Sequence, residues 1–308
     1  MELKWLEDFV SLANTRNFSK SAEQRNVTQP AFSRRIRALE NWLGTSLVDR
    51  STYPTSLTES GRAFRETAEQ ALILLNQARD DFREQQGRTR ATISFSVLHG
   101  ITLSFFPKWL KEIQSLIGPL STRIDPGNFH DCVQALVDGD HDFLLTYSNQ
   151  SVPVLLDPQK YPSIKLAEDT LMPVSAADSG GRPLFKLETD QPEPVPWLNY
   201  SSHSYIGRAE EFIHSQQKPR LNLNPICENP MGESLKALAL EGHGVAWLTK
   251  TSVEAEITDK KLVPIGSEKL VMPFDICIYR SVQKTRPQVM QFWSCIESLS
   301  QFTHDATE

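Results

Sequence analysis

Polar side chains between residues 29 and 37 have the spacing to share one face of a helix. With Gln29 at zero and about 100° per residue, Ser33 falls at about 40°, Arg37 at about 80°, Pro30 at about 100° and Arg34 at about 140°. The other side carries a narrow apolar seam made of Phe32, Ile36, Leu39 and Leu43. A glutamine amide pairs with adenine, and a guanidinium pairs with guanine O6 and N7. The pattern therefore predicts a helix that reads base edges in the major groove of DNA, with an ordinary solvated face as the alternative.

Two shorter helices precede this one and must position it. Apolar residues recur at helical spacing over residues 3–13, so the first helix should end near residues 14–17. Ser19 is the expected N-cap of a second helix, Asn26 suits the left-handed turn after it, and Thr28 should cap the third helix through its hydroxyl. Two short helices, a tight turn and a basic third helix are typical of a helix-turn-helix. We count Ser19 and Thr28 among its expected DNA contacts.

A short hairpin, or wing, is expected after the third helix. Apolar residues at 47–48 and at 57 flank a polar stretch that contains a proline. Arg50 lies at the edge of this wing, where its guanidinium would reach a phosphate or the minor groove. The alternative is a salt bridge to Asp49 or Glu40, and the sequence favours neither.

A long amphipathic helix is predicted from about residue 58 to residue 86, with Thr58 as its cap. It would be about 43 Å long, and so small a head cannot bury its apolar stripe. The stripe consists of Phe64, Ala68, Ala71, Leu75, Ala78 and Phe82. Pairing with the same helix of a second chain would bury it and would place two recognition helices on one face of DNA.

Charge separates the two ends of the chain. The 308 residues carry a formal charge of −6, which alone argues against a nucleic-acid partner. Residues 16–50 nevertheless hold seven Lys/Arg against three Asp/Glu, a local +4, whereas residues 91–308 hold 18 against 26, a local −8. A basic head on an acidic body agrees with DNA binding by the head.

Composition excludes several other classes of protein. The hydrophobic share of 39% supplies a core, and no residue type is extreme, so collagen-like, disulfide-stapled and disordered chains are excluded. The four cysteines lie at least 18 positions apart, which excludes CxxC pairs. The first ten residues contain three acids and resemble no export signal, and the longest uncharged stretch is interrupted by polar residues. We therefore expect a cytoplasmic protein with reduced thiols and no membrane span.

The segment AEQRNVTQPAFSRRIRALENWLGTSLVDR, followed by LTESG, closely resembles the helix-turn-helix of the LysR-type transcriptional regulators. The resemblance implies DNA contacts from Gln29, Pro30, Ser33 and Arg34, with Arg50 on the wing. It also implies an effector-binding domain and a homotetramer built from two kinds of subunit contact.

Two departures from the family pattern lie away from the groove-facing side chains. Ser21 precedes Ala22 where the family has an alanine pair, and Val48 replaces the usual phenylalanine. Residues 52–56 also depart from the usual sequence of the wing, next to its expected DNA contact at Arg50.

The body alternates strands and helices. The expected strands are 93–97, 121–125, 142–147, 165–167, 171–175, 197–201, 223–227, 245–249 and 270–279, and the expected helices are 102–114, 129–138, 205–214, 231–241 and 287–300. This βαβ rhythm predicts a mainly parallel sheet with flanking helices. The fold class is therefore α/β, with a mainly α winged helix-turn-helix, a long linker helix and a two-lobed α/β effector domain of the periplasmic-binding-protein type.

The expected domain boundaries follow from these elements. The DNA-binding domain takes residues 1–58, the linker and dimerisation helix residues 59–88, and the effector-binding domain residues 89–308. Lobe one should hold about 91–162 and 266–302, and lobe two about 163–265.

A ligand would lie at the carboxyl ends of the strands of both lobes, facing helix N-termini. Helix N-termini and hydroxyl groups suit a small anion such as a carboxylate. The candidates are His99, Gly100, Thr102 and Asn128 from lobe one and Asn199, Ser202, His203 and Met231 from lobe two. Each of them has an ordinary role in capping or turn formation as its alternative.

Enzymatic motifs are missing from the sequence. No glycine precedes a lysine and no histidine precedes a glutamate, so neither a Walker loop nor an HExxH metal motif is present. The GHG at 242–244 follows a predicted helix, where a dinucleotide loop would follow a strand. Ser202 and His203 are adjacent in the sequence, but adjacency alone does not give the spatial arrangement of a catalytic triad. We expect a protein that is no enzyme and needs no cofactor or metal.

Oxidant sensing is a further possibility for the effector domain. The segments WLNYSSHSYIGR and GHGVAWL resemble the hypochlorite-responsive branch of the LysR-type family. Met231 is the leading redox candidate because it is expected to open a helix at the cleft, and Cys227 is the second. Buried Met and Cys are more often plain core residues. The alternatives are a regulator that senses an anionic metabolite without redox chemistry and a binding protein or enzyme of the same two-lobed fold.

Overall fold

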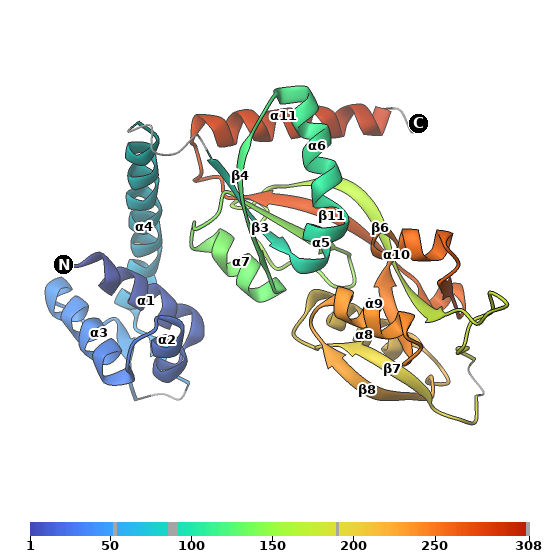
Figure 1. The fold of residues 1–308 in the computed structure, drawn as a ribbon. Coiled ribbons are helices and arrows are strands. Elements are labelled where there is room, and N and C mark those ends of the chain that lie inside the picture. The colour runs from blue at the N-terminus through green and yellow to red at the C-terminus, as the bar shows by residue number, and fades with distance from the viewer. Residues whose placement is uncertain (52–53, 86–91, 189–190, 306–308) are drawn as a thin grey trace. The chain divides into compact units, whose positions relative to one another are not determined.

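The chain forms two compact units, Met1–Thr89 and Arg90–Glu308, which are described separately (Figure 1). The computed structural model describes residues 1–51, 54–85, 92–188 and 191–305. Within these ranges, no helix is both long and apolar enough to cross a lipid bilayer.

The first unit is a winged helix-turn-helix followed by a long helix, as predicted. Its elements are α1 (Leu3–Thr15), α2 (Phe18–Gln24), α3 (Gln29–Leu43), β1 (Val48–Asp49), β2 (Ser56–Leu57) and α4 (Glu59–Gln85). The two short strands pair antiparallel and form the wing. Pro30 lies in the first turn of α3, where its missing N–H has no helical partner to lose.

Two capping predictions need correction. Asn17, not Ser19, caps α2, because its side chain accepts hydrogen bonds from the N–H groups of Ser19 (2.9 Å) and Lys20 (3.1 Å). The helix thus begins at Phe18, two residues earlier than a Ser19 cap allows. Thr28 occupies the N-cap position of α3, but its hydroxyl makes no capping bond. Asn26 does adopt the expected left-handed conformation, with φ of 53°.

The apolar stripe of α4 is divided between two environments. Thr58 accepts a hydrogen bond from the Gly61 N–H at 2.9 Å, as expected of its cap. Phe64 packs on Phe9 of α1 with the ring centroids 5.6 Å apart, and Ala68 is buried in the same core. Leu75, one to two turns further on, remains exposed. The prediction that the head cannot bury the stripe is therefore wrong for its beginning; the side chain of residue 82 lies outside the described residues.

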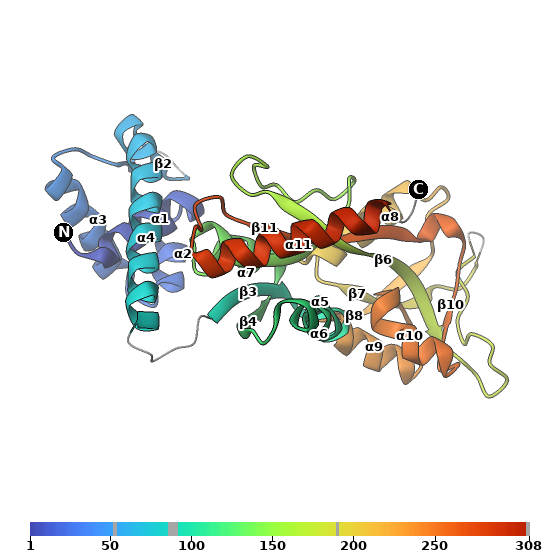
Figure 2. The same cartoon turned by 90° about the horizontal axis from the view of Figure 1, so that it is seen from above.

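The second unit contains one mixed sheet with helices on both faces (Figures 1 and 2). Its strands are β3 (Thr92–Leu98), β4 (Ser121–Gly127), β5 (Phe143–Ser148), β6 (Ser163–Ala176), β7 (Val195–Tyr200), β8 (Leu223–Asn229), β9 (Val245–Thr249), β10 (Leu262–Pro264) and β11 (Met272–Arg280). Its helices are α5 (His99–Ser104), α6 (Phe106–Ile117), α7 (Phe129–Val137), α8 (Tyr205–Gln216), α9 (Gly232–Leu240), α10 (Lys250–Thr258) and α11 (Pro287–Asp305), with a 3-10 turn at Glu268–Leu270.

The strand order is β4-β3-β5-β11-β6-β9-β7-β8, with β10 paired to β6. Strand β3 runs parallel to β4 and β5, and strand β7 runs parallel to β8 and β9. We call these the first and the second strand group. The antiparallel strands β6 and β11 join the two groups, since β11 pairs with β5 and β6 pairs with β9.

Several expectations for the second unit were wrong. The sheet is mixed and not mainly parallel, because β6 and β11 run antiparallel to their neighbours. The helix expected at 102–114 is divided at Phe105 into α5 and α6, and α5 already begins at His99.

The segments 165–167 and 171–175 belong to one 14-residue strand, β6, because its residues keep pairing with β11 up to Leu171 and then pair with β9. Helix α10 was not predicted, since its sequence KTSVEAEIT has little apolar periodicity.

Aromatic packing closes the first strand group. Phe292 of α11 lies 5.6 Å from Phe95 of β3 and 5.2 Å from Phe143 of β5, measured between ring centroids. Trp109 of α6 contacts the same cluster. Helix α11, at the C-terminal end of the unit, therefore packs against the first strand group, although it is far from these strands in the sequence.

Candidate functional site: a nucleic-acid interface and a ligand pocket

Helix α3 separates its buried seam from its polar face. Phe32, Ile36 and Leu39 are fully buried in the core of the head. The predicted contact residues lie on the opposite side. Gln29, Pro30, Arg34 and Arg37 are exposed, Ser33 is half-buried, and Ser19 and Thr28 at the starts of the helices are exposed as well.

Part of the positive charge of the head is used internally. Asp8 of α1 is inaccessible to solvent, and it binds Arg25 Nε through Oδ1 at 3.0 Å and Arg35 Nη1 through Oδ2 at 3.2 Å. Arg25 also contacts Glu7. Burial opposes the charge on Arg25, but its bonds to Asp8 and Glu7 outweigh this and raise its pKa. These two arginines hold α1, α2 and α3 together.

The remaining cations of α3 are free for an external partner. Arg34 and Arg37 form no ion pair and no side-chain hydrogen bond with any residue that the structure describes. Both guanidinium groups lie on the exposed side of the helix. The polar face of α3 thus combines one amide, one hydroxyl and two unpaired guanidinium groups, which is the chemistry that base edges and phosphates require.

Arg50 forms the salt bridge that the sequence left open. Its Nη2 lies 2.8 Å from Oε2 of Glu40, which is itself buried. The other oxygen of Glu40 accepts hydrogen bonds from the N–H groups of Leu47 (3.0 Å) and Val48 (3.2 Å). One carboxylate therefore ties the end of α3 to the wing. The residues at 52–53 of the wing lie outside the described ranges.

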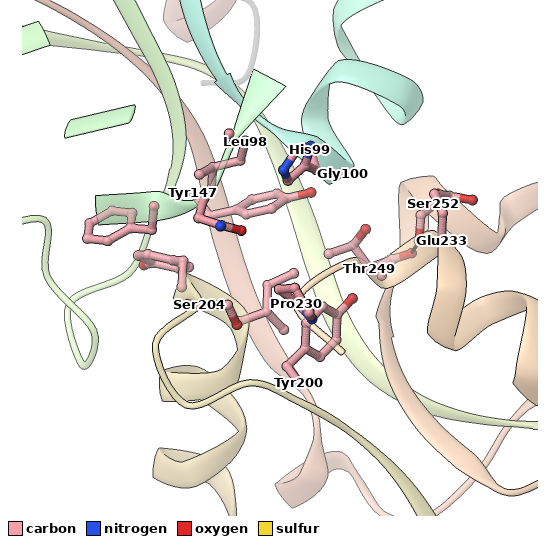
Figure 3. Close-up of a pocket in the computed structure, with 16 residues that line it drawn as sticks. Leu98, His99, Gly100, Tyr147, Tyr200, Ser204, Pro230, Glu233, Thr249 and Ser252 are labelled. Carbon is pink, nitrogen blue, oxygen red and sulfur yellow. Dashed lines mark hydrogen bonds between the residues drawn. The ribbon is translucent and has the colours of Figure 1, made fainter. Parts of the chain in front are cut away.

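A pocket of about 40 Å³ lies in the second unit, at the carboxyl ends of its parallel strands (Figure 3). Strand ends from both groups contribute to it, and so do the first turns of α5, α7, α8 and α9. Its lining consists of Leu98, His99, Gly100, Gly127, Asn128, Phe129, Tyr147, Tyr200, Ser204, Tyr205, Ile206, Pro230, Gly232, Glu233, Thr249 and Ser252.

Three of the eight predicted ligand residues line this pocket, namely His99, Gly100 and Asn128. Gly100 lies in the first turn of α5, where a turn between strand and helix was expected. The other five predicted residues are outside the lining. The Thr102 hydroxyl donates to the Leu98 carbonyl, and the Asn199 amide donates to the Tyr200 carbonyl. Ser202 and His203 are exposed, and Met231 is the N-cap of α9 between two lining residues.

Sequence reasoning missed the two tyrosines of the pocket. Tyr147 ends the apolar run FLLTYS and Tyr200 ends VPWLNY, so both resemble core residues. Tyr147 is 1% exposed, and its hydroxyl makes no hydrogen bond of regular geometry within the described chain, although the hydroxyl groups of Thr249 and Ser104 lie close enough to act on its pKa. Burial raises the pKa of both phenols, and the charge of Asp169 adds to this for Tyr147. Both hydroxyls therefore stay protonated and able to donate.

An acidic cluster borders the pocket beside these tyrosines. Lys236 Nζ lies 2.8 Å from Glu233 and 3.3 Å from Glu256, and it donates to the Ser252 carbonyl at 2.9 Å. Two carboxylates thus share one ammonium group. Asp169 is separate, because its Oδ1 accepts the N–H of Thr251 at 3.1 Å and so caps the first turn of α10.

Two other cysteines, Cys132 and Cys277, differ in their surroundings from the redox candidates Cys227 and Met231. Burial raises the pKa of Cys132 to about 11 and that of Cys277 to about 12, so both thiols stay protonated and unreactive. Cys227 on β8 is half-buried, and Met231 is 37% exposed. Across the described residues, no group of three or more His, Cys, Asp or Glu side chains is placed to hold a metal ion.

A polar helix face on a winged helix-turn-helix and a pocket in a separate α/β unit define the class of DNA-binding, ligand-responsive regulators. The chain belongs to the LysR family. Residues 3–62 match the bacterial regulatory helix-turn-helix protein model of that family, and residues 86–300 match the LysR substrate binding domain.

Individual relatives support the same assignment. The HTH-type transcriptional regulator YjiE of Escherichia coli K12 is 34% identical over 300 residues, which cover 97% of this chain and 95% of that protein. Vibrio fischeri DarR in complex with DNA is 35% identical with a TM-score of 0.59, over 96% of this chain and 98% of DarR. Full-length HypT of Salmonella typhimurium, described as a hypochlorite-specific LysR-type regulator, is 32% identical with a TM-score of 0.61, over 98% and 99% of the two chains. These relatives are transcriptional regulators, and this chain is one too rather than an enzyme.

Proposed function

We propose that the protein regulates transcription by reading DNA through α3 and by binding a small anionic effector in the pocket of its second unit. Gln29, Pro30, Ser33 and Arg34 contact base edges. Arg37, Ser19, Thr28 and Arg50 contact the backbone around them. The observation that carries the first part is the exposed face of α3 with its two unpaired guanidinium groups. The relative DarR, solved with DNA, supports it.

A selection experiment tests the DNA-reading part. The full chain is incubated with a library of random duplexes, and the retained DNA is sequenced. We expect one two-fold symmetric site to be enriched, and the double variant Gln29→Ala, Arg34→Ala to enrich none. A full chain that enriches no sequence would contradict the proposal.

The assembly that we propose is a homodimer through α4 and a homotetramer of two such dimers. Leu74 and Leu75 on α4 are 65% and 51% exposed, which is costly for leucines in water. A second α4 would cover them. Two heads on one duplex also explain why a symmetric site is expected. Because the protein acts on DNA, we place it in the cytoplasm.

The second unit would bind its effector between two lobes, one of residues about 91–162 and 266–302 and one of about 163–265. Helices α7 and α9 lie against the pocket, and their N-cap residues, Asn128 and Met231, make no side-chain capping bond. First-turn amides without caps carry partial positive charge, which suits an anion. The unpartnered hydroxyl of Tyr147 adds a donor from the strand side.

The second candidate is oxidant sensing in a stress response, through Met231 or Cys227. HypT, described as hypochlorite-specific, favours it, and so does the partial exposure of Met231 beside the pocket. Hypochlorite would oxidise the thioether to a polar sulfoxide at the start of α9. DNA affinity measured before and after a pulse of hypochlorite tests this. A response that persists unchanged in Met231→Leu would remove this residue from the mechanism, and Cys227→Ser tests the thiol in the same way.

A further inference from the structure

We propose that the effector is a small anion that also carries a hydrogen-bond donor, a hydroxyl or an ammonium group, and that Glu233 is the residue that reads this donor. This inference rests on the proposed function, since it takes the pocket of the second unit to be the effector site. The inference adds a hydrogen-bond acceptor, the carboxylate of Glu233, which an anion without a donor group could not pair with.

The anion-binding side of the pocket is formed by donors. The first turns of α7 and α9 present main-chain N–H groups from the two strand groups. Tyr147 Oη is buried and makes no hydrogen bond of regular geometry in the described part of the chain. A buried hydroxyl without a partner costs free energy, which a ligand oxygen would recover. In Figure 3 this hydroxyl points toward the side of the pocket that holds Thr249, Ser252 and Glu233.

The acceptor side is formed by Glu233. It lies in the first turn of α9 and lines the pocket beside Ser252 and Thr249 (Figure 3). Its Oε2 is held by Lys236 at 2.8 Å, which fixes the side chain at the rim of the pocket. A carboxylate accepts hydrogen bonds only, so a ligand group next to it must donate.

The charge balance disfavours a bare anion. Lys236 is shared between Glu233 and Glu256, so the three side chains together carry one net negative charge. No lysine or arginine is among the described residues that line the pocket; the guanidinium of Arg208 stacks on the ring of Phe129 at 4.4 Å and is outside the lining. A simple anion would therefore meet the attraction of the helix N-termini together with repulsion from this cluster. A hydroxyl or ammonium group on the same molecule removes the conflict, because it pairs with Glu233 directly.

The pocket is small and partly open to solvent, so small acids are the first probes to test. A Cβ atom added to Gly232 would come within 2.3 Å of Tyr200 Oη, so the backbone of α9 already touches the tyrosine side of the pocket. The free space is about 40 Å³. Three-carbon acids are therefore suitable probes, and their substituent at the second carbon is varied while their size is kept.

The experiment measures the binding of propionate, lactate and alanine to the full chain by calorimetry, with both enantiomers of the last two. Propionate supplies the anion alone, lactate adds a hydroxyl group and alanine adds an ammonium group. We expect lactate or alanine to bind about tenfold more tightly than propionate, which corresponds to one hydrogen bond to a charged group. The preference should disappear in Glu233→Gln. Glu254→Gln, an exposed glutamate of α10, is the matched control and should keep it.

Each outcome has a distinct meaning. Propionate that binds as tightly as lactate and alanine would overturn the role of Glu233 but leave an anion site in place. A preference that survives in Glu233→Gln would overturn it as well. If no probe binds, both this inference and the anionic effector are overturned, whereas selection of a specific duplex by α3 would still stand. The comparison of probes on the unmodified chain is decisive even if the Glu233 variant does not fold.

Discussion

The head and the pocket treat their polar side chains in opposite ways. In the head, buried acids are paired: Asp8 holds two arginines and Glu40 holds Arg50, while Arg34 and Arg37 are exposed and form no ion pair with any described residue. In the pocket, the polar groups without partners are buried, as the hydroxyl of Tyr147 is. DNA would contact an exposed face of a helix that salt bridges hold in place. A small molecule would contact polar groups that are already buried. The polar groups available to a partner are therefore exposed in the head and buried in the pocket.

Removing the carboxylate of Asp8, which links the helices of the head, should have the largest effect on stability. In Asp8→Asn, Arg25 and Arg35 lose their shared carboxylate in a partly buried position. We expect the free energy of unfolding of the head to fall by about 3 kcal/mol. Thermal unfolding of the full chain, followed by DNA binding, measures this. Glu2→Gln removes an exposed ion pair of the same unit and should leave the melting temperature unchanged; equal losses in both variants would contradict the bracing role of Asp8.

Truncating an unpaired guanidinium should change binding and leave folding intact. Arg34→Ala should cost about 2 kcal/mol of discrimination against the wrong base at one position of the site. Arg37→Ala should instead weaken binding to all sequences and lower the salt slope by about 1. Fluorescence anisotropy with matched and mismatched duplexes separates the two. Arg220→Ala, an exposed arginine of the second unit, should change neither value.

The pocket side of the comparison predicts a pH dependence. Glu210 of α8 is buried, and it accepts the N–H of Tyr200, a pocket residue, at 2.9 Å. Burial raises the pKa of Glu210 to about 8. The folded unit therefore keeps a proton that the unfolded chain releases above its ordinary pKa of about 4.3, so folding takes up a proton and stability falls as pH rises.

With a folded-state pKa of about 8, the expected loss is about 1.2 kcal/mol between pH 6.5 and pH 7.5. Denaturant unfolding of the chain and of Glu210→Gln at the two pH values measures it, because the contributions of the other groups cancel in the difference. The Gln variant should show less decline over this interval. Parallel declines in the two proteins would mean that Glu210 is ionised in the fold.

The exposed leucines of α4 should give the smallest change per chain. Leu75→Ala removes apolar surface that a second α4 would cover, and should weaken the dimer by about 1 kcal/mol per chain. Sedimentation velocity over a range of concentrations measures the dissociation constant. Leu155→Ala alters a side chain that is even more exposed, outside any helix or strand, and serves as the control. An α4 variant with an unchanged dissociation constant would exclude this dimer contact.

Sequence reasoning worked best where periodicity and motif coincide. The polar face and buried seam of α3 follow directly from residue spacing, and the βαβ rhythm of the second unit was recovered because its strands alternate with amphipathic helices. It failed where long-range pairing decides the outcome. Strand β6 looks like two short strands until its neighbours are known, and Tyr147 looks like a core residue until the opposite strand group supplies the other side of the pocket.

Cap positions were intermediate between these cases. Asn17 and Ser19 are both good caps, and the contact of Phe18 with Phe32 in the core agrees with the earlier start. Asn128 and Met231 were both placed at the right helix starts, but only Asn128 lines the pocket. Glu233, two positions beyond Met231, lines the pocket, whereas Met231 does not.

Strands β6 and β11 form a continuous antiparallel ribbon through the middle of the second unit. Because this ribbon links the two strand groups, a change in the angle between them would require the ribbon to twist. The ladder shifts register between Ile276 and Cys277, and such an irregularity is where a ribbon bends and twists most readily. The resistance of the ladder to twisting at this point would therefore set the free energy that effector binding must supply to change the angle between the two strand groups.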